Sequence, residues 1–317
     1  EVIIKQWLNG GCMTTRFRLT GSELAFSILN ELHEYALKGD EELFRSKLIE
    51  LTREVLTERP ACMSAINVLR AVLLRYIEHG FNGISDFVAD LRSRYDHSLW
   101  RAAEMASRRV LNGERVLTNS NSLAVRRLLK TLHDQGKEVV LYVTESRPGN
   151  EGLLMAEYAE NLGYSVHLIV DSAARFFMKD IDKVFVGAEA IASNGAVVSK
   201  VGTSLISLVA KEARKRIFVI APSFKLSYET IHGELLRVPE KDFSALVSSE
   251  DIAKLPSGYK ARVPIYDVTP PEYVDAIITE YGLYAPQAVP ILLRLIYGSY
   301  PPQVTPIEDI LSLVSKT

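Results

Sequence analysis

The most informative segment of this chain runs from Lys183 to Lys225 and reads KVFVGAEAIASNGAVVSKVGTSLISLVAKEARKRIFVIAPSFK. Two short apolar runs, 184–186 and 217–220, enclose a polar loop with glycine and an amphipathic stretch. This order predicts a strand, a loop, a helix and a second strand, which is the βαβ unit of a parallel sheet. Glu189 follows the first predicted strand directly. Open α/β sheets place functional groups just beyond the carboxyl ends of their strands, so Glu189 is a candidate site residue.

The helix of this unit is predicted to span 204–215, directly after Gly202 and Thr203. The first N–H groups of a helix lack partners within the helix and carry a partial positive charge. With Lys200 close by, this helix start suits a phosphate or a carboxylate. The alternative is an ordinary βαβ unit with a capped helix, because a glycine and a threonine are common before helices.

Composition narrows the class of protein. The chain has 317 residues, enough for two domains or one large one, and its 47% hydrophobic and 24% charged residues are typical of a folded globular protein. The net charge of −2 argues against a protein that binds nucleic acid without regard to sequence. Cys12 and Cys62 are the only cysteines, which argues against a disulfide framework and fits a reducing cytosol. We find no apolar run of transmembrane length and no signal-peptide pattern, and we expect a cytoplasmic protein with no membrane contact.

The first third of the chain is predicted to be helical, as an N-terminal domain of residues 1–112. Thr20 and Glu23 form a capping-box pattern at the start of the first helix. Glu58-Arg59-Pro60 should end the second helix near residue 57, and Pro60 should open the third. Two further helices are expected at 84–95 and 98–111.

Strands and helices alternate after Asn112-Gly113, which predicts a Rossmann-like α/β domain of residues 113–317 with a parallel sheet and helices on both faces. No GxGxxG follows a predicted strand, so dinucleotide binding of the usual kind is not supported. Residues 226–263 read as an irregular, charged surface excursion, and 285–297 as an amphipathic helix. The predicted strands are 116–118, 139–144, 166–170, 184–186, 217–220 and 277–278.

Polar residues follow five of these strands, and a parallel sheet places all five strand ends on one rim. Arg147, Lys200 and Lys225 would give this rim a local positive charge among hydroxyl and amide donors. That combination suits a phosphorylated small molecule. The alternative is five ordinary loops, each capped separately.

Candidates for catalysis are few. None of the six histidines falls on the predicted rim, and no His and Cys pair has metal-ligand spacing, so we expect no metal. Ser120 follows the first strand, but a serine acts as a nucleophile only with a base beside it. Glu189 is the one acid in a good position.

The run GAEAIASNGAVVSKVGT at 187–203, with TESRP at 144–148, DSAA at 171–174 and SFK at 223–225, resembles the regulatory (α/β/δ) subunits of translation initiation factor 2B. The same superfamily contains ribose-1,5-bisphosphate isomerase and methylthioribose-1-phosphate isomerase. The match also includes ERP at 58–60 and YDVTPPEYVDAIITEYG at 266–282, and the latter looks most like the archaeal ribose-1,5-bisphosphate isomerases. The resemblance implies an N-terminal helical bundle and a Rossmann-like domain through which the protein dimerises.

Two departures from the isomerase pattern stand out. The isomerases carry a catalytic Cys in a Thr-His-Cys context and an Asp in a Gly-Ala-Asp motif, whereas this chain has Ser120 and Glu189 at the matching positions. A serine hydroxyl does not ionise near neutral pH, whereas a thiol needs only a modest pKa shift. A glutamate is one methylene longer than an aspartate, and catalysis is sensitive to displacements of that order. Both changes argue against isomerase activity.

The resemblance implies that the residues that handle phosphate are retained: Arg59, Arg147, Asn194, Lys200 and Lys225. We therefore expect a non-catalytic homodimer of the factor 2B α type, with a pocket for a sugar phosphate or a nucleotide and no further cofactor. Translation initiation factor 2 is its candidate partner. The alternative is a ribose-1,5-bisphosphate isomerase with Ser120 and Glu189 at its site.

Overall fold

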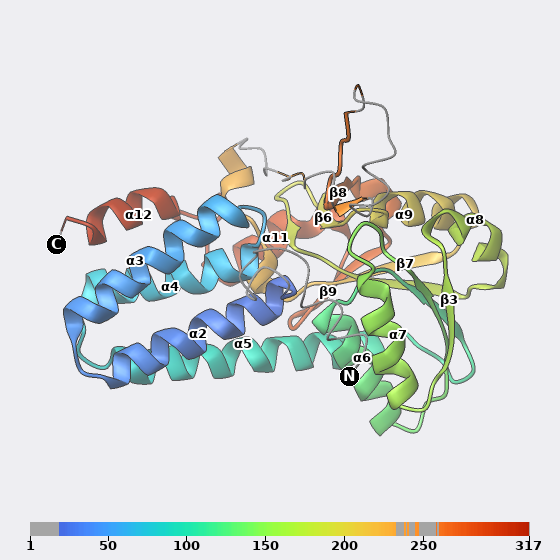
Figure 1. Ribbon diagram of the computed structural model, residues 1–317, viewed down its shortest axis with the longest axis horizontal. Helices are drawn as coiled ribbons and strands as arrows, with labels where there is room; N and C mark the ends of the chain where they lie inside the picture. Colours follow the sequence, from blue (N-terminus) through green and yellow to red (C-terminus); the bar gives the residue numbers. More distant parts are fainter. Residues whose placement is uncertain are drawn as a thin grey trace.

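The computed structural model describes residues 19–232 and 260–316, together with residues 238, 240, 245, 246 and 258. Within these residues, a layer of long helices lies beside an α/β part built on a mostly parallel sheet (Figure 1). The predicted fold class, a helical bundle followed by a Rossmann-like sheet with helices on both faces, is confirmed.

The helical layer consists of α2 (Gly21–Leu37), α3 (Glu41–Glu58), α4 (Met63–His79) and α5 (Ile84–Ser107). The predicted capping box starts α2: the Glu23 N–H donates to the Thr20 hydroxyl at 3.3 Å, and the Thr20 N–H donates to the Glu23 carboxylate at 2.9 Å. Apolar residues at helical spacing bury one face of each helix. The largest fully buried side chains of the layer include Tyr95, Phe44, Leu24, Ile28, Leu48 and Leu69.

Two predicted helix boundaries were wrong. A single helix, α5, replaces the predicted helices 84–95 and 98–111. Tyr95, Leu99 and Ala102 are all buried on the same face, so the packing continues through residues 96–98 without a break. Pro60 does not open α4, because Arg59 leaves the helical conformation and residues 60–61 form a turn before the helix begins at Met63.

The main sheet has seven strands in the order β10-β9-β7-β4-β1-β2-β3. Neighbouring strands are parallel except for β9 and β10, which form an antiparallel pair at one edge. Six of these strands match the predicted ones within two residues; β10 was not predicted. The strands are β1 (Arg115–Thr118), β2 (Val140–Thr144), β3 (Ser165–Ile169), β4 (Lys183–Gly187), β7 (Arg216–Ile220), β9 (Ala276–Thr279) and β10 (Gly282–Tyr284).

A second, three-stranded antiparallel sheet was missed. It consists of β5 (Ala190–Ile191), β6 (Val197–Lys200) and β8 (Tyr266–Thr269), in the order β5-β6-β8. The sequence analysis placed β6 in a loop that leads into a helix and β8 in a polar turn. These strands have two to four residues each, and pairing between β6 and β8 joins segments far apart in the chain, so local patterns carry little signal for them.

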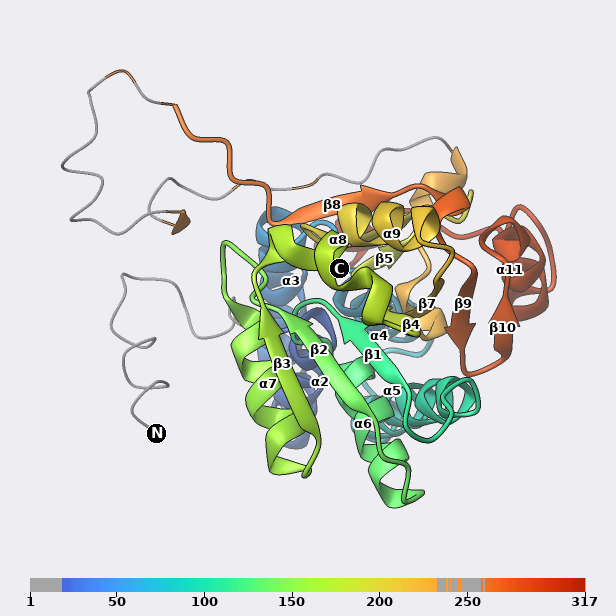
Figure 2. The same cartoon turned by 90° about the vertical axis from the view of Figure 1, so that its right-hand side faces the viewer.

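Helices cover both faces of the main sheet (Figure 2). One cluster of buried apolar side chains joins α6 and α7 with the helical layer, and a second lies under α8, α9 and α11. The helices are α6 (Leu123–Asp134), α7 (Glu151–Asn161), α8 (Ala174–Phe177), α9 (Thr203–Glu212) and α11 (Val289–Tyr297). Short 3-10 turns span Asp171–Ala173, Met178–Asp180, Ser223–Lys225, Glu229–His232, Pro271–Tyr273 and Pro286–Ala288.

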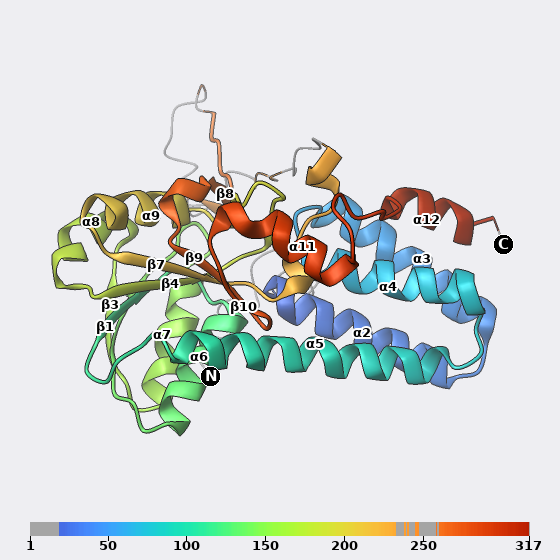
Figure 3. The same cartoon turned by 180° about the vertical axis from the view of Figure 1, so that it is seen from behind.

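The end of the chain returns to the helical layer. Helix α12 (Ile307–Val314), which was not predicted, packs on α4 and α3 (Figure 3). Its buried residues Ile307, Ile310 and Val314 join the same apolar cluster as the N-terminal helices. The proposed division at residue 112 stays a prediction, and α12 lies with the first part despite its place in the second.

Most of the predicted charged excursion at 226–263 falls on residues 233–259, which lie largely outside the described residues. Among the helices that are described, none combines the length and the apolar character needed to cross a membrane.

The start of α7 offers a test of how tightly the loop after β2 is packed. A Cβ atom on Gly152 would lie 1.8 Å from the backbone carbonyl oxygen of Thr144. We expect Gly152→Ala to lower the free energy of unfolding by about 1–3 kcal/mol, because backbone must move to admit the methyl group. Urea unfolding followed by circular dichroism measures this change.

Gly258→Ala is the matched control, because a Cβ atom there meets no atom of the described residues within 4 Å. It should change the unfolding free energy by less than about 0.5 kcal/mol. Equal effects of the two substitutions would contradict the packing described for Gly152.

Candidate active site

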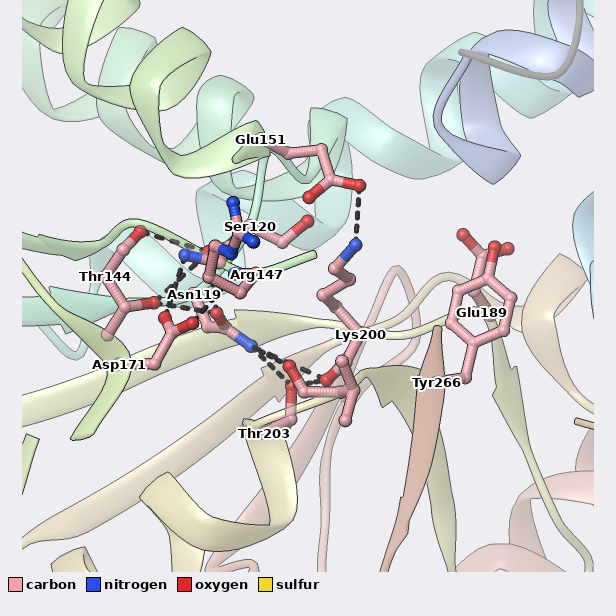
Figure 4. A network of polar contacts seen from close by, with 12 residues as sticks. Asn119, Ser120, Thr144, Arg147, Glu151, Asp171, Glu189, Lys200, Thr203 and Tyr266 are labelled. Atoms are coloured by element: carbon pink, nitrogen blue, oxygen red, sulfur yellow. Dashed lines mark hydrogen bonds and ion pairs between the residues drawn. The ribbon is translucent and has the colours of Figure 1, made fainter. Parts of the chain in front are cut away.

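A cavity of about 1150 Å³ lies between the helical layer and the carboxyl ends of the parallel strands. Its polar wall combines residues from the start of α2, the loops after β1 and β4, the start of α7, and the small sheet. Figure 4 shows part of this wall, with Lys200 reaching toward Glu151, and Glu189 beside Tyr266. The polar lining includes Arg59, Asn119, Ser120, Asn121, Glu151, Glu189, Ser199, Lys200, Lys225 and Tyr266.

Glu189 lies at the junction of the two layers. Its carboxylate oxygen Oε1 is 3.5 Å from a guanidinium nitrogen of Arg59 and accepts a hydrogen bond of 3.3 Å from the N–H of Gly21, the first residue of α2. The Met63 N–H donates to the Glu189 backbone carbonyl at 3.3 Å. A Cβ atom on Gly21 would lie 2.2 Å from Oε2 of Glu189, so only a glycine permits this approach. Two helices of the layer therefore fix the position of Glu189.

Arg59 links three parts of the chain and is only 6% exposed. Its guanidinium group donates to the Leu19 carbonyl and to the Tyr266 hydroxyl, both at 3.0 Å. Burial raises the pKa of Tyr266, so its hydroxyl keeps its proton at neutral pH. The buried guanidinium group of Arg59 thus connects the helical layer to the small sheet.

Two further titratable groups lie close to Glu189. Lys225 is 4% exposed and donates to the Ala188 carbonyl, and burial lowers the pKa of its ammonium group. Burial also raises the pKa of the Cys62 thiol to about 12. Cys62 is therefore a protonated, buried group that contacts the Gly21 carbonyl at 3.6 Å. Lys225, in contrast, lines the cavity and can release a proton more readily than an exposed lysine.

Ser120 is held by a hydrogen-bond network after β1. Its N–H donates to the Ser146 hydroxyl at 2.7 Å, and its φ of 66° places it in the left-handed region, which is uncommon for a serine. Asn119 accepts bonds from the hydroxyls of Thr144 at 2.7 Å and Ser146 at 2.8 Å, and donates to the hydroxyl of Thr203 at 3.0 Å. This network joins the ends of β1 and β2 to the start of α9 and turns Ser120 to the cavity wall.

The structure brings together only some of the predicted phosphate-binding residues. Arg59, Lys200 and Lys225 line the cavity, whereas Arg147 and Asn194 are not among the residues that line it. Arg147 is exposed and its guanidinium group donates to the Leu246 carbonyl. The Asn194 side chain accepts from the Ala196 N–H at 3.0 Å and closes the turn between β5 and β6.

The predicted anion site at the start of α9 is occupied by the protein itself. A carboxylate oxygen of Asp267 accepts hydrogen bonds from the N–H groups of Gly202 at 2.8 Å and Ser204 at 3.1 Å. Of the two alternatives, an anion site and an ordinary capped helix, the structure therefore shows the capped helix. Asp267 reaches it because β8 pairs with β6, a contact that spans more than sixty residues of sequence.

Sequence reasoning also missed Asn119, Glu151 and Tyr266. Glu151 had a usable signal, because it lies just after a polar segment that follows a predicted strand. Tyr266 had none, since its place at the cavity depends on the small sheet. The described residues contain no group of three or more His, Cys, Asp or Glu side chains arranged to hold a metal ion.

Residues 19–286 match the sequence profile of the Initiation factor 2 subunit family, and the chain belongs to this family. The chain is 38% identical to the ribose 1,5-bisphosphate isomerase of Methanocaldococcus jannaschii, over 84% of this chain and 87% of the relative. It is 36% identical to the protein of the same name from Archaeoglobus fulgidus, over 83% of this chain and 84% of the relative. A solved structure of translation initiation factor eIF-2B from Pyrococcus horikoshii OT3 superposes with a TM-score of 0.71 at 26% identity, and covers 84% of this chain and 92% of that chain.

The expectation of a non-catalytic protein of the factor 2B α type was wrong. Five archaeal relatives named ribose 1,5-bisphosphate isomerase are 33% to 38% identical to this chain over 82% to 84% of its length. These relatives favour the isomerase alternative. Ser120 and Glu189 do not by themselves exclude catalysis, because a hydroxyl still forms hydrogen bonds and a glutamate still supplies a carboxylate.

Asp267 allows a test of the capped start of α9. Burial raises its pKa from 3.8 to about 6. A carboxyl group with a raised pKa in the folded state contributes stability that is fully present below pH 3.8 and is lost as the pH rises through about 6. Compared with Asp267→Asn, the unmodified protein should lose up to about 3 kcal/mol of unfolding free energy between pH 4 and pH 7.

Chemical unfolding of both proteins across this pH range measures the difference. Asparagine still offers an oxygen to the two N–H groups but does not titrate. A constant difference between the two proteins from pH 4 to pH 7 would contradict the buried cap.

Proposed function

We propose that this protein is an aldose–ketose isomerase that converts ribose 1,5-bisphosphate to ribulose 1,5-bisphosphate. The names of the five archaeal relatives support the substrate. The observation that carries the proposal is the position of Glu189: a carboxylate at a strand end, fixed by Arg59 and Gly21, in a cavity that also holds Lys200 and Lys225.

The buried cations support a substrate with two phosphate groups. Arg59, Lys200 and Lys225 are each less than 10% exposed, and all three line the same cavity. A buried cation is costly unless an anion neutralises it, and Glu189 and Glu151 alone supply fewer charges than two phosphate groups would. A bisphosphate therefore fits the charge of this cavity better than a neutral sugar does.

The reaction moves hydrogen within the substrate. The bond between C1 and the ring oxygen breaks, and that oxygen gains a proton to become a hydroxyl group. The hydrogen on C2 is transferred to C1, and the hydroxyl group on C2 loses its proton as it becomes the ketone. Atoms and electrons balance within the sugar, so the protein has to supply groups that accept and donate protons.

In this proposal Glu189 accepts the proton that the substrate releases, because this residue lines the cavity just beyond the carboxyl end of β4. Lys225 donates the proton that the ring oxygen gains, since its lowered pKa makes the ammonium group a better acid. Ser120 offers a hydroxyl group in place of the thiol that the resemblance implies for the isomerases. The homodimer and the contact with initiation factor 2 stay predictions.

The proposal is tested by turnover of ribose 1,5-bisphosphate by the unmodified protein and by Glu189→Gln. We expect the substitution to lower kcat at least about 100-fold, because it removes a proton acceptor and keeps the size of the side chain. Glu138→Gln is the control, since Glu138 is exposed and precedes β2 at the opposite end of the strand.

The control should keep the kcat and the unfolding temperature of the unmodified protein, and turnover by Glu189→Gln is compared at a temperature at which circular dichroism shows that variant to be folded, because it loses the ion pair with Arg59. Equal turnover by the unmodified protein and Glu189→Gln would remove Glu189 from the mechanism. Absence of turnover in a folded, unmodified protein would overturn the proposed function.

A further inference from the structure

We propose that Glu151 is an internal counter-ion for Lys200, which a phosphate group of the ligand must displace. In this view the cavity holds a stand-in anion before the ligand arrives, and Glu151 sets the minimum charge that a ligand must bring. The inference rests on the proposed function only in that the ligand carries phosphate.

The ion pair lies on the cavity wall. The Lys200 ammonium group is 2.6 Å from Oε1 of Glu151, and both residues line the cavity (Figure 4). The two side chains differ in exposure: 10% for Lys200 and 33% for Glu151. A phosphate oxygen that comes within bonding distance of the Lys200 ammonium group also comes close to the Glu151 carboxylate, and like charges repel.

Lys200 is anchored more firmly than Glu151. Its backbone pairs with Tyr266 in the small sheet, and its carbonyl oxygen accepts a bond of 2.7 Å from the Thr203 hydroxyl. Its side chain is almost completely buried, so the ammonium group stays where it is when its partner leaves.

The Glu151 carboxylate can move while its backbone cannot. Gly152 next to it is packed against the Thr144 carbonyl, which fixes the first turn of α7. Gly149 also lies against the Glu151 carboxylate. A Cβ atom on Gly149 would lie 2.3 Å from Oε1 of Glu151, so the absence of a side chain at residue 149 makes room for the carboxylate. Oε2 has no hydrogen-bond partner among the described residues. Rotation of the side chain toward solvent therefore breaks one interaction, the bond to Lys200.

This exchange predicts charge selectivity. A phosphate with nearly two negative charges replaces the single charge of Glu151 at Lys200 with a net gain, whereas a neutral sugar cannot compete for the lysine at all. Removal of the Glu151 charge should thus tighten the binding of phosphate. If the pair is merely structural and links α7 to β6, its removal should weaken binding and lower stability instead.

Isothermal titration of the full chain with inorganic phosphate separates these two cases. We expect Glu151→Gln to lower the Kd for phosphate about tenfold, which corresponds to about 1.4 kcal/mol of binding free energy. Glu151→Asp, whose carboxylate is one methylene further from Lys200, should lie between the two. Glu138→Gln removes a carboxylate from an exposed position before β2, at the opposite end of the strand and outside the cavity lining, and should change the Kd less than twofold.

A second background checks the mechanism. In Lys200→Met, phosphate binding should weaken, and adding Glu151→Gln should no longer tighten it. Binding by Glu151→Gln and Glu151→Asp that equals or falls below that of the unmodified protein overturns the inference. So does tightening by Glu151→Gln that persists in the Lys200→Met background.

These titrations do not depend on turnover. Tighter phosphate binding by Glu151→Gln in a protein that does not isomerise ribose 1,5-bisphosphate would support the counter-ion and reject the proposed function. Turnover by the unmodified protein without tighter phosphate binding by the variants would support the proposed function and reject the counter-ion.

Discussion

The contact between Arg59 and Glu189 is the constraint on which the rest of this structure depends. Arg59 directly follows α3, and Glu189 lies two residues after the end of β4. A guanidinium nitrogen of Arg59 is 3.5 Å from a carboxylate oxygen of Glu189, where the helical layer covers the strand ends. Removing one partner of a buried ion pair leaves an uncompensated charge, which typically costs about 3–5 kcal/mol. The helical layer and the sheet must therefore meet in one arrangement, and the same contact builds the cavity.

The cavity contains charge that the fold itself only partly balances. Arg59 contacts Glu189, the Tyr266 hydroxyl and the Leu19 carbonyl. Lys225 donates to the Ala188 carbonyl, and Lys200 is paired with the Glu151 carboxylate. Buried cations with weak or replaceable partners are what a site needs if it is to bind phosphate and still release it. Stability and ligand binding therefore draw on the same few residues, and a ligand that neutralises them should stabilise the folded protein.

Local patterns predicted the parts of the fold that local forces determine. The Thr20 capping box, the apolar faces of the N-terminal helices and six parallel strands could all be predicted from spacing within short windows. The small sheet, the cap that Asp267 provides and the pair between Glu151 and Lys200 could not, because each joins residues about fifty or more positions apart. Strand order and motifs also predicted five residues that line the cavity: Arg59, Ser120, Glu189, Lys200 and Lys225. Arg147 and Asn194 were predicted there as well but do not line it, because a motif does not show which way a side chain turns.

The most direct test of the central claim is the fate of ribose 1,5-bisphosphate itself, followed by ³¹P nuclear magnetic resonance in the presence of the unmodified protein. We expect the signal of the phosphate on the anomeric carbon to disappear and a signal of a phosphate on a CH₂ group to replace it, much faster than without protein. A substrate that stays unchanged for hours, while the folded protein binds it, would contradict the claim that this cavity is an isomerase site.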